Sequence, residues 1–203
     1  MGFGLSIEAT IADALAEHGW AVAASFLPPD LIHALAADTR ERLQTGGFRA
    51  AGVGAGARHA VRDAVRRDDI HWLEPPGAGA AQQACLARFE ALRQSLNRAL
   101  QLGLLDFECH YARYVPGAFY RRHLDRLAGD DRRALSCILY LNDAWLPEDG
   151  GHLRLYLGTD SLDVPPEGGT LVTFLSERFA HEVLPGRRDR LSLTGWFRRR
   201  GPA

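Results

Sequence analysis

A histidine and an aspartate two residues apart give the first indication of chemistry in this sequence. His123 and Asp125 stand at the end of Tyr120–Leu124, a segment that we predict to be a strand. Residues two apart on a strand point to the same face, so an imidazole and a carboxylate can bind one metal ion there. Because the chain has eight histidines, such a pair also arises by chance, and alone it is weak evidence.

His181 supplies the third group of a possible metal site. It lies 58 residues after His123 (181 minus 123), on another predicted strand. Two histidines and one carboxylate form the facial triad of non-haem iron(II) oxygenases, which leaves coordination positions open. Zinc favours four tetrahedral ligands, and catalytic zinc sites with this ligand set usually draw it from a helical motif that the sequence lacks. The alternative for His181 is a core histidine satisfied by hydrogen bonds.

Arg190 follows His181 by nine residues, with Pro185-Gly186 midway between them. We predict a hairpin centred on that turn, which places His181 and Arg190 opposite each other on one face. A guanidinium group in that position can bind a carboxylate in a forked pair. A buried arginine without an acidic partner is costly, so we prefer a ligand carboxylate to a pairing with Asp189 or Glu182.

Composition and charge exclude several classes of protein. The chain has 203 residues and a formal net charge of -1, so no general electrostatic argument favours nucleic acid or an anionic membrane as a partner. We see no transmembrane segment and no signal peptide. Cys85, Cys109 and Cys137 have no CxxC spacing, which predicts reduced thiols in a cytoplasmic protein.

The first half of the chain is predicted to be mostly helical. Apolar residues at helical spacing predict helices over 7–18, 31–43 and 79–102, with Gly19 and Gly103 ending the first and the third. Residues 46–75 form a glycine-rich and charged segment that includes the strand-like Ile70–Leu73. A loop of that length in a compact domain is more often functional than a short one, although a solvated surface loop is the alternative.

After Gly103 the pattern changes to period two, which is typical of strands. The predicted strands are 107–115, 120–124, 134–142, 152–157, 162–164, 170–174, 180–184 and 190–198. Short strands with even spacing indicate a double-stranded β-helix, or jelly roll, so the fold class is α+β with supporting N-terminal helices. We predict one domain over 1–203, in which 1–103 gives helical support plus a substrate loop at about 46–75, and 104–200 form the jelly-roll catalytic core.

From about Arg62 to Arg198 the sequence resembles the prolyl hydroxylase domain branch of the iron(II)- and 2-oxoglutarate-dependent oxygenases. That branch includes bacterial homologues of the enzymes that hydroxylate hypoxia-inducible factor. The resemblance rests on an ordered and correctly spaced set of segments: Tyr114-Val-Pro-Gly117, Tyr120-Arg-Arg-His-Leu-Asp125, Ser136-Cys-Ile-Leu-Tyr-Leu-Asn142 with Trp145, Gly150-Gly-His-Leu-Arg154, His181-Glu-Val183 and Arg190–Phe197. Residues 1 to about 60 carry little of it beyond their helical pattern.

The resemblance implies how iron and 2-oxoglutarate are held. His123, Asp125 and His181 would ligate iron(II). Arg190 would pair with the distal carboxylate of 2-oxoglutarate, and Tyr140 would donate a hydrogen bond to it. Oxygen is the further cosubstrate, and a role for ascorbate stays open.

The resemblance also implies how the rest of the pocket is built. Thr194 and Tyr114 would line the cosubstrate pocket, Trp196 would pack near the metal, and Arg133 would lie at the substrate entrance. Alternatively, Tyr140 and Trp196 are ordinary aromatic residues of the core.

Residues 65–72 resemble the mobile loop with which the family covers its substrate, together with the strand that follows. Arg66 and Asp68 would help to close this loop, and a solvated charge run is the alternative. Because the covering loop at about 46–75 is rich in glycine and alanine, the family's substrate contacts do not carry over to it.

The implied activity is hydroxylation of a C–H bond with iron(II), 2-oxoglutarate and oxygen. We expect a prolyl 4-hydroxylase that acts on an exposed proline-containing segment of a protein, with no nucleic acid or membrane as partner. Two alternatives stay open. One is a hydroxylase of another residue or of a small molecule; the other is a non-enzymatic jelly-roll binding module in which these residues coincide by chance.

Overall fold

The computed structural model describes residues 5–52, 60–74, 77–125 and 132–201. Its helices and strands are α1 (Ile7–His18), β1 (Trp20–Ala23), α2 (Pro29–Gln44), β2 (Arg49–Ala50), β3 (Asp68–Trp72), α3 (Ala80–Leu100), β4 (Leu104–Tyr114), β5 (Tyr120–His123), β6 (Arg133–Tyr140), the 3-10 helix η3 (Pro147–Asp149), β7 (Leu153–Leu157), β8 (Asp160–Val164), β9 (Leu171–Leu175), β10 (His181–Val183) and β11 (Arg190–Arg199).

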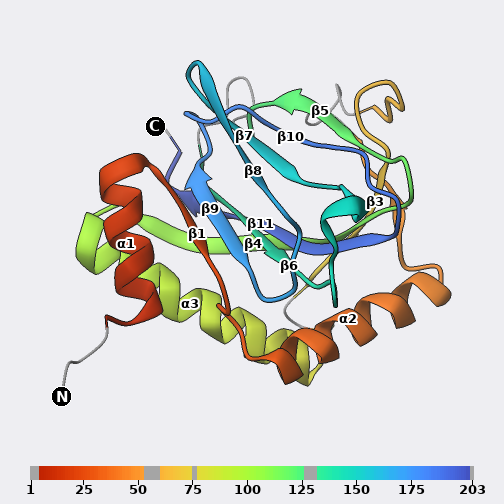
Figure 1. Ribbon diagram of the computed structural model, residues 1–203. Coiled ribbons are helices and arrows are strands. Elements are labelled where there is room, and N and C mark those ends of the chain that lie inside the picture. The colour runs from red at the N-terminus through yellow and green to blue at the C-terminus, as the bar shows by residue number, and fades with distance from the viewer. Residues whose placement is uncertain (1–4, 53–59, 75–76, 126–131, 202–203) are drawn as a thin grey trace.

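Two antiparallel sheets form the body of the molecule. The larger sheet has the strand order β1-β9-β6-β11-β4-β3-β2, and the smaller has the order β5-β10-β7-β8. The three helices lie on the side of the larger sheet that faces away from the smaller one (Figure 1). This arrangement confirms the predicted α+β jelly roll with supporting helices.

Two apolar clusters hold these layers together. The first lies between the helices and the larger sheet, where Phe89 of α3 stacks on Phe107 of β4 with ring centroids 4.3 Å apart. The second lies between the sheets and includes Ile138, Leu153 and Val183. Burial of apolar surface in both clusters stabilises the fold, and the second cluster surrounds the candidate site.

Local sequence signals set the ends of the helices. Ser6 caps α1, because its side chain accepts a hydrogen bond from the Ala9 amide, and Gly19 ends the helix at φ 82°. The prediction that α3 runs to residue 102 and stops at Gly103 was wrong by two residues. Gln101 takes the left-handed position at φ 52°, and the Asn97 side chain bonds the backbone of Leu104 through both of its polar atoms, which turns the chain into β4.

The eight predicted strands are present with ends shifted by up to three residues. The short strand β1 was not predicted, because four residues form a strand there only through pairing with β9. The predicted loop at 46–75 is in part an edge of the larger sheet, since β2 pairs with β3 and β3 pairs with β4. Its residues 53–59 and 75 lie outside the described part of the chain.

The predicted hairpin that joins His181 to Arg190 is wrong. His181 begins β10, which lies between β5 and β7 in the smaller sheet, whereas Arg190 begins β11, which lies between β4 and β6 in the larger sheet. Because both edges of each strand already have a partner, the two strands cannot pair with each other. The segment between them crosses from one sheet to the other, and Gly186 forms an isolated bridge with Gly150.

The sequence also predicted that the chain has no transmembrane segment and that its cysteines are reduced. Among the described helices, none is long and apolar enough to span a membrane. Cys85, Cys109 and Cys137 are all free and buried, and they contribute to the cluster under the helices.

Gly195 provides a test of the close packing within the larger sheet. A Cβ atom at this position would lie 2.5 Å from Phe107 and 2.6 Å from the carbonyl oxygen of Glu108. Since backbone of β4 cannot yield as a flexible side chain does, Gly195→Ala should lower the free energy of unfolding by about 3 kcal/mol in urea titrations. Gly77→Ala is the control, because, apart from its chain neighbours, no described residue has an atom within 4 Å of its added Cβ; equal stability of the two variants would contradict this packing.

Candidate active site

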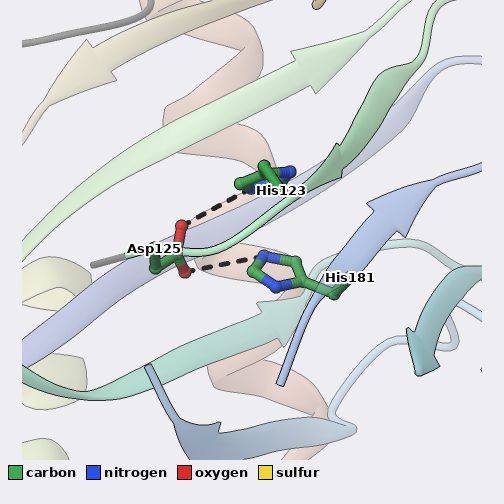
Figure 2. Close-up of side chains that lie close together, drawn as sticks. All are labelled: His123, Asp125 and His181. Carbon is green, nitrogen blue, oxygen red and sulfur yellow. Dashed lines mark ion pairs between the residues drawn. The ribbon is translucent and has the colours of Figure 1, made fainter. Parts of the chain in front are cut away.

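Three side chains from the smaller sheet converge on one point (Figure 2). His123 ends β5, Asp125 follows it, and His181 pairs with His123 across the β5–β10 ladder. Their possible ligand atoms all lie within 4.8 Å of one another. His123 Nε2 is 3.5 Å from Asp125 Oδ1, and His181 Nε2 is 3.6 Å from Asp125 Oδ2.

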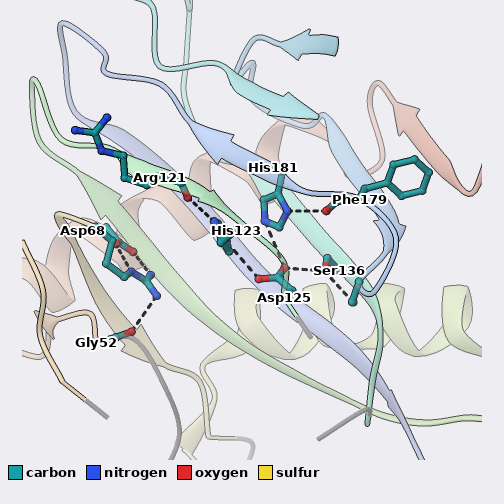
Figure 3. A network of polar contacts seen from close by, with 10 residues as sticks. Gly52, Asp68, Arg121, His123, Asp125, Ser136, Phe179 and His181 are labelled. Carbon is teal, nitrogen blue, oxygen red and sulfur yellow. Dashed lines mark hydrogen bonds and ion pairs between the residues drawn. The ribbon is translucent and has the colours of Figure 1, made fainter. Parts of the chain in front are cut away.

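Backbone carbonyls orient both imidazoles (Figure 3). His123 Nδ1 lies 2.7 Å from the Arg121 carbonyl oxygen, and His181 Nδ1 lies 3.2 Å from that of Phe179. An Nδ1–H donated to a carbonyl leaves Nε2 as a free lone pair, which is the form that binds a metal. Burial lowers the pKa of His181 to about 4, so its ring is neutral at neutral pH.

Asp125 is held as an ionised carboxylate. Burial alone would raise its pKa, but His181, His123 and the hydrogen bond from Ser136 outweigh burial and lower the pKa. Ser136 Oγ donates to Asp125 Oδ2 over 2.7 Å, and Ser176 Oγ lies 2.9 Å from Ser136 Oγ (Figure 3). Two imidazoles that turn Nε2 toward one carboxylate fit the ligand set of an iron(II) ion that keeps open coordination positions.

Arg190 provides a second charged group in the same cavity. Its side chain is only 2% exposed, and Nε donates to the Gly151 carbonyl oxygen over 3.0 Å. The guanidinium carbon lies 5.0 Å from the ring centroids of both Tyr114 and Tyr140. In the described part of the chain, no carboxylate lies within ion-pair distance of this cation: Asp189 pairs with Arg113, and Glu182 accepts from Tyr156.

A second polar group beside Arg190 also lacks a partner. The hydroxyl of Tyr140 is fully buried and has no hydrogen-bond partner within the described ranges. Burial raises the pKa of Tyr140, which Arg190 offsets only in part, so the hydroxyl stays a neutral donor. A buried cation without a counter-charge and a buried hydroxyl without an acceptor both cost free energy unless a ligand supplies the missing group. The carboxylate of a bound diacid fits both groups.

Comparison with known proteins agrees with this site. The sequence profile of the 2OG-Fe(II) oxygenase superfamily matches residues 109–198. A crystal structure of a Pseudomonas putida prolyl-4-hydroxylase is 51% identical, covers 96% of this chain and 100% of that chain, and superposes with a TM-score of 0.87. The chain belongs to the 2OG-Fe(II) oxygenase superfamily.

Two further relatives of this oxygenase are animal proteins. A Trichoplax adhaerens prolyl hydroxylase, solved with a peptide fragment of the hypoxia-inducible factor oxygen degradation domain, is 25% identical with a TM-score of 0.85, and the match covers 95% of this chain and 89% of that one. The hypoxia-inducible factor prolyl hydroxylase of Caenorhabditis elegans is 31% identical over 198 residues, which cover 90% of this chain. The oxygenase spans only 27% of the length of that protein.

The residues predicted around the triad of the oxygenase line one cavity of about 510 Å³. Thr194, Tyr114, Trp196, Arg133 and Arg66 all contribute side chains to its wall. Tyr140 and Asp68 are buried and are not among the residues that line it.

Arg133 and Trp196 form one contact at the cavity wall. The guanidinium carbon of Arg133 lies 3.5 Å from the ring centroid of Trp196, and Nε of Arg133 donates to Glu108 over 2.9 Å. The indole nitrogen of Trp196 is buried and has no partner among the described residues. The alternative of an ordinary core aromatic therefore does not describe Trp196, whose ring forms a face of the cavity.

The alternative of a solvated charge run is wrong for Arg66 and Asp68. Asp68 is 3% exposed, and Arg66 Nε donates to its Oδ1 over 2.7 Å while NH1 reaches the Gly52 carbonyl oxygen. Arg66 also covers the ring of Tyr120, which stacks on His123 with centroids 3.5 Å apart. Tyr120 thus connects Arg66, in the segment before β3, with His123 of the candidate metal triad.

Several residues of the site were not singled out from the sequence as site residues. Ser136 and Ser176 support Asp125, Tyr120 stacks on His123, and His110 and Trp72 line the cavity. Period two along β6 was the available signal for Ser136, since Ser136, Ile138 and Tyr140 share the inner face. Ser176 follows β9, and no pattern in the sequence relates it to Asp125.

Ser136 allows a test of how the candidate metal triad is oriented. Ser136→Ala removes the hydrogen bond that fixes Asp125 and should raise the Kd for Mn(II), used in place of iron(II), about ten- to a hundredfold. Metal affinity can be measured by calorimetry. Ser161→Ala, an exposed position on β8, is the control; wild-type affinity in both variants would refute the positioning role.

Proposed function

We propose that this chain is an iron(II)- and 2-oxoglutarate-dependent prolyl 4-hydroxylase that acts on a proline-containing segment of a protein. One observation carries the proposal: a triad of two imidazoles and a carboxylate shares its cavity with an arginine that lacks a carboxylate partner in the described residues. The relatives support the prolyl substrate, because the Pseudomonas putida and Trichoplax adhaerens proteins are both described as prolyl hydroxylases.

The chain's own residues would divide the work of this reaction. His123, Asp125 and His181 would hold iron(II) from one side. Iron(II) supplies oxygen activation when bound: with 2-oxoglutarate and O2, one oxygen atom enters the C–H bond and the other enters succinate as carbon dioxide leaves. Arg190 and Tyr140 would fix the distal carboxylate of 2-oxoglutarate and so orient the keto acid before reaction.

The cavity wall would protect the reaction from water. Ile138, Leu153 and Val183 line it with apolar side chains, and Arg66 with Asp68 would hold the segment before β3 against the opening. Exclusion of water prevents loss of a reactive oxidant to side reactions.

A cytoplasmic location, which the free and buried cysteines support, is part of the same proposal.

The triad is tested by Asp125→Ala. The variant should fold as the wild type does, because the exposed side of the cavity can admit water, but it should produce no succinate from 2-oxoglutarate. Succinate is measured in the presence and absence of iron(II), and circular dichroism serves as the folding control. Substantial iron-dependent turnover by the variant would contradict the triad.

Arg190→Ala tests the second half of the site. Loss of a buried charge-assisted pair should raise the KM for 2-oxoglutarate about a hundredfold, equivalent to about 3 kcal/mol. Arg187→Ala, an exposed arginine in the same connection, should behave as the wild type. An unchanged KM in Arg190→Ala would remove the assignment.

The identity of the substrate is tested by mass spectrometry. A panel of proline-containing peptides is incubated with the enzyme, iron(II) and 2-oxoglutarate, and products are sequenced. We expect the mass of one oxygen atom to be added to proline at C4. Oxygen on another residue, or turnover only with small molecules, would favour the alternative hydroxylase, and absence of iron- and 2-oxoglutarate-dependent succinate production would favour a binding module.

A further inference from the structure

The cavity extends sideways beyond the line from Arg190 to the triad. Arg190 starts β11, and Ser136, which bonds to Asp125, lies on the neighbouring strand β6. The proposed position of 2-oxoglutarate is therefore over β11 and β6. On the other side of β11 come β4 and then β3, about 5 and 10 Å away at ordinary strand spacing. His110 of β4 and Trp72 of β3 line this second part of the cavity.

His110 is fixed in place by its neighbours. It lies opposite Thr194 on β11 and opposite Trp72 on β3. Its ring stacks on Trp196 at a centroid distance of 5.5 Å and meets Trp72 at 4.9 Å. The imidazole is 3% exposed, so the wall presents one rigid nitrogen-containing ring between two indoles.

The polar atoms of His110 lack partners. Nδ1 is enclosed and has no hydrogen-bond partner in the described ranges. Nε2 makes no hydrogen bond with a described residue either, and it belongs to a ring that borders the cavity. Burial, with Arg66 and Arg133 nearby, lowers the pKa of His110 to about 3, so the ring is neutral and carries a single N–H.

The surroundings of the two ring nitrogens of His110 indicate which of them carries the proton. An enclosed N–H without an acceptor is among the rarest features of folded proteins, whereas an unpaired acceptor is less rare. The proton therefore belongs on Nε2, at the cavity, and Nδ1 is the bare nitrogen. The indole N–H of Trp196 is enclosed and has no partner among the described residues, so it adds no donor at the cavity surface.

We propose that His110 is a specificity-determining residue whose Nε2–H donates a hydrogen bond to a carbonyl oxygen of the substrate segment bound between Trp72 and Trp196. The inference rests on the proposed prolyl hydroxylase function. Proline has no backbone N–H, so a peptide at its proline presents carbonyl oxygens and an apolar ring. A wall of two indoles and a neutral N–H donor matches both features.

Kinetics of His110→Phe and His110→Gln test the proposal. Phenylalanine keeps the ring stack and removes the donor, and glutamine restores an N–H donor. With the peptide that the wild type hydroxylates best, His110→Phe should raise the peptide KM about tenfold, with kcat and the KM for 2-oxoglutarate within about twofold. His110→Gln should recover most of the loss. His33→Phe, exposed on α2, is the control.

Two outcomes distinguish this inference from the function on which it rests. An unchanged peptide KM in His110→Phe, or a change confined to 2-oxoglutarate, would overturn the role of His110 and leave the hydroxylase proposal intact. If the wild type hydroxylates no peptide of the panel, the proposed substrate class and this inference both fail.

Nuclear magnetic resonance of protein that carries 15N in its histidine rings gives a readout that does not depend on turnover. With Zn(II) and 2-oxoglutarate bound, the 15N spectrum should show His110 as the neutral Nε2–H tautomer from about pH 5 to 8. Addition of the peptide should shift its Hε2 resonance downfield, which a purely packing ring would not show. An Nδ1–H tautomer, an imidazolium or an unmoved Hε2 signal would refute the proposed contact.

Discussion

The site depends on burying one carboxylate between two imidazoles. Asp125 lies deep between the sheets, where an ionised group is stable only with several partners at once. Those partners come from separate parts of the chain: His123 precedes it, His181 arrives on β10, and Ser136 reaches from the opposite sheet. The site therefore requires the two sheets to face each other, because their approach brings Ser136 of β6 to the carboxylate that follows β5.

Three arginines that line the cavity differ in their partners. Arg66 and Arg133 are neutralised by Asp68 and Glu108, and such pairs shape the wall without demanding a ligand. Arg190 is buried beside two tyrosine rings, and its acceptor among the described residues is a backbone carbonyl. The contrast matters because a buried cation that lacks a counter-charge is stable chiefly when a ligand supplies one. Of these three arginines, Arg190 is therefore the one placed to select an anion.

Local patterns in the sequence predicted much of the fold and of the site. The features that they missed depend on pairing between strands that lie far apart in the sequence. Period two put His123 and Asp125 on one face, and the residue types named His181 and Arg190 as their companions. Their relation was predicted wrongly, because a turn between two strands indicates a hairpin only if the facing edges are free. Here β10 and β11 each have two other partners. Ser176 and the short strand β1 likewise depend on contacts that no local pattern encodes.

The three cysteines of the core have a consequence for a protein that handles oxygen. Burial raises the pKa of Cys85 and Cys137 to about 12 and also raises that of Cys109. Oxidants attack thiolates far faster than thiols. The fold thus keeps its sulfur in an unreactive form beneath a sheet whose other face borders the oxidising centre, and the helical layer shields it from the solvent side. Durability over many catalytic cycles is then a property of the scaffold as well as of the site.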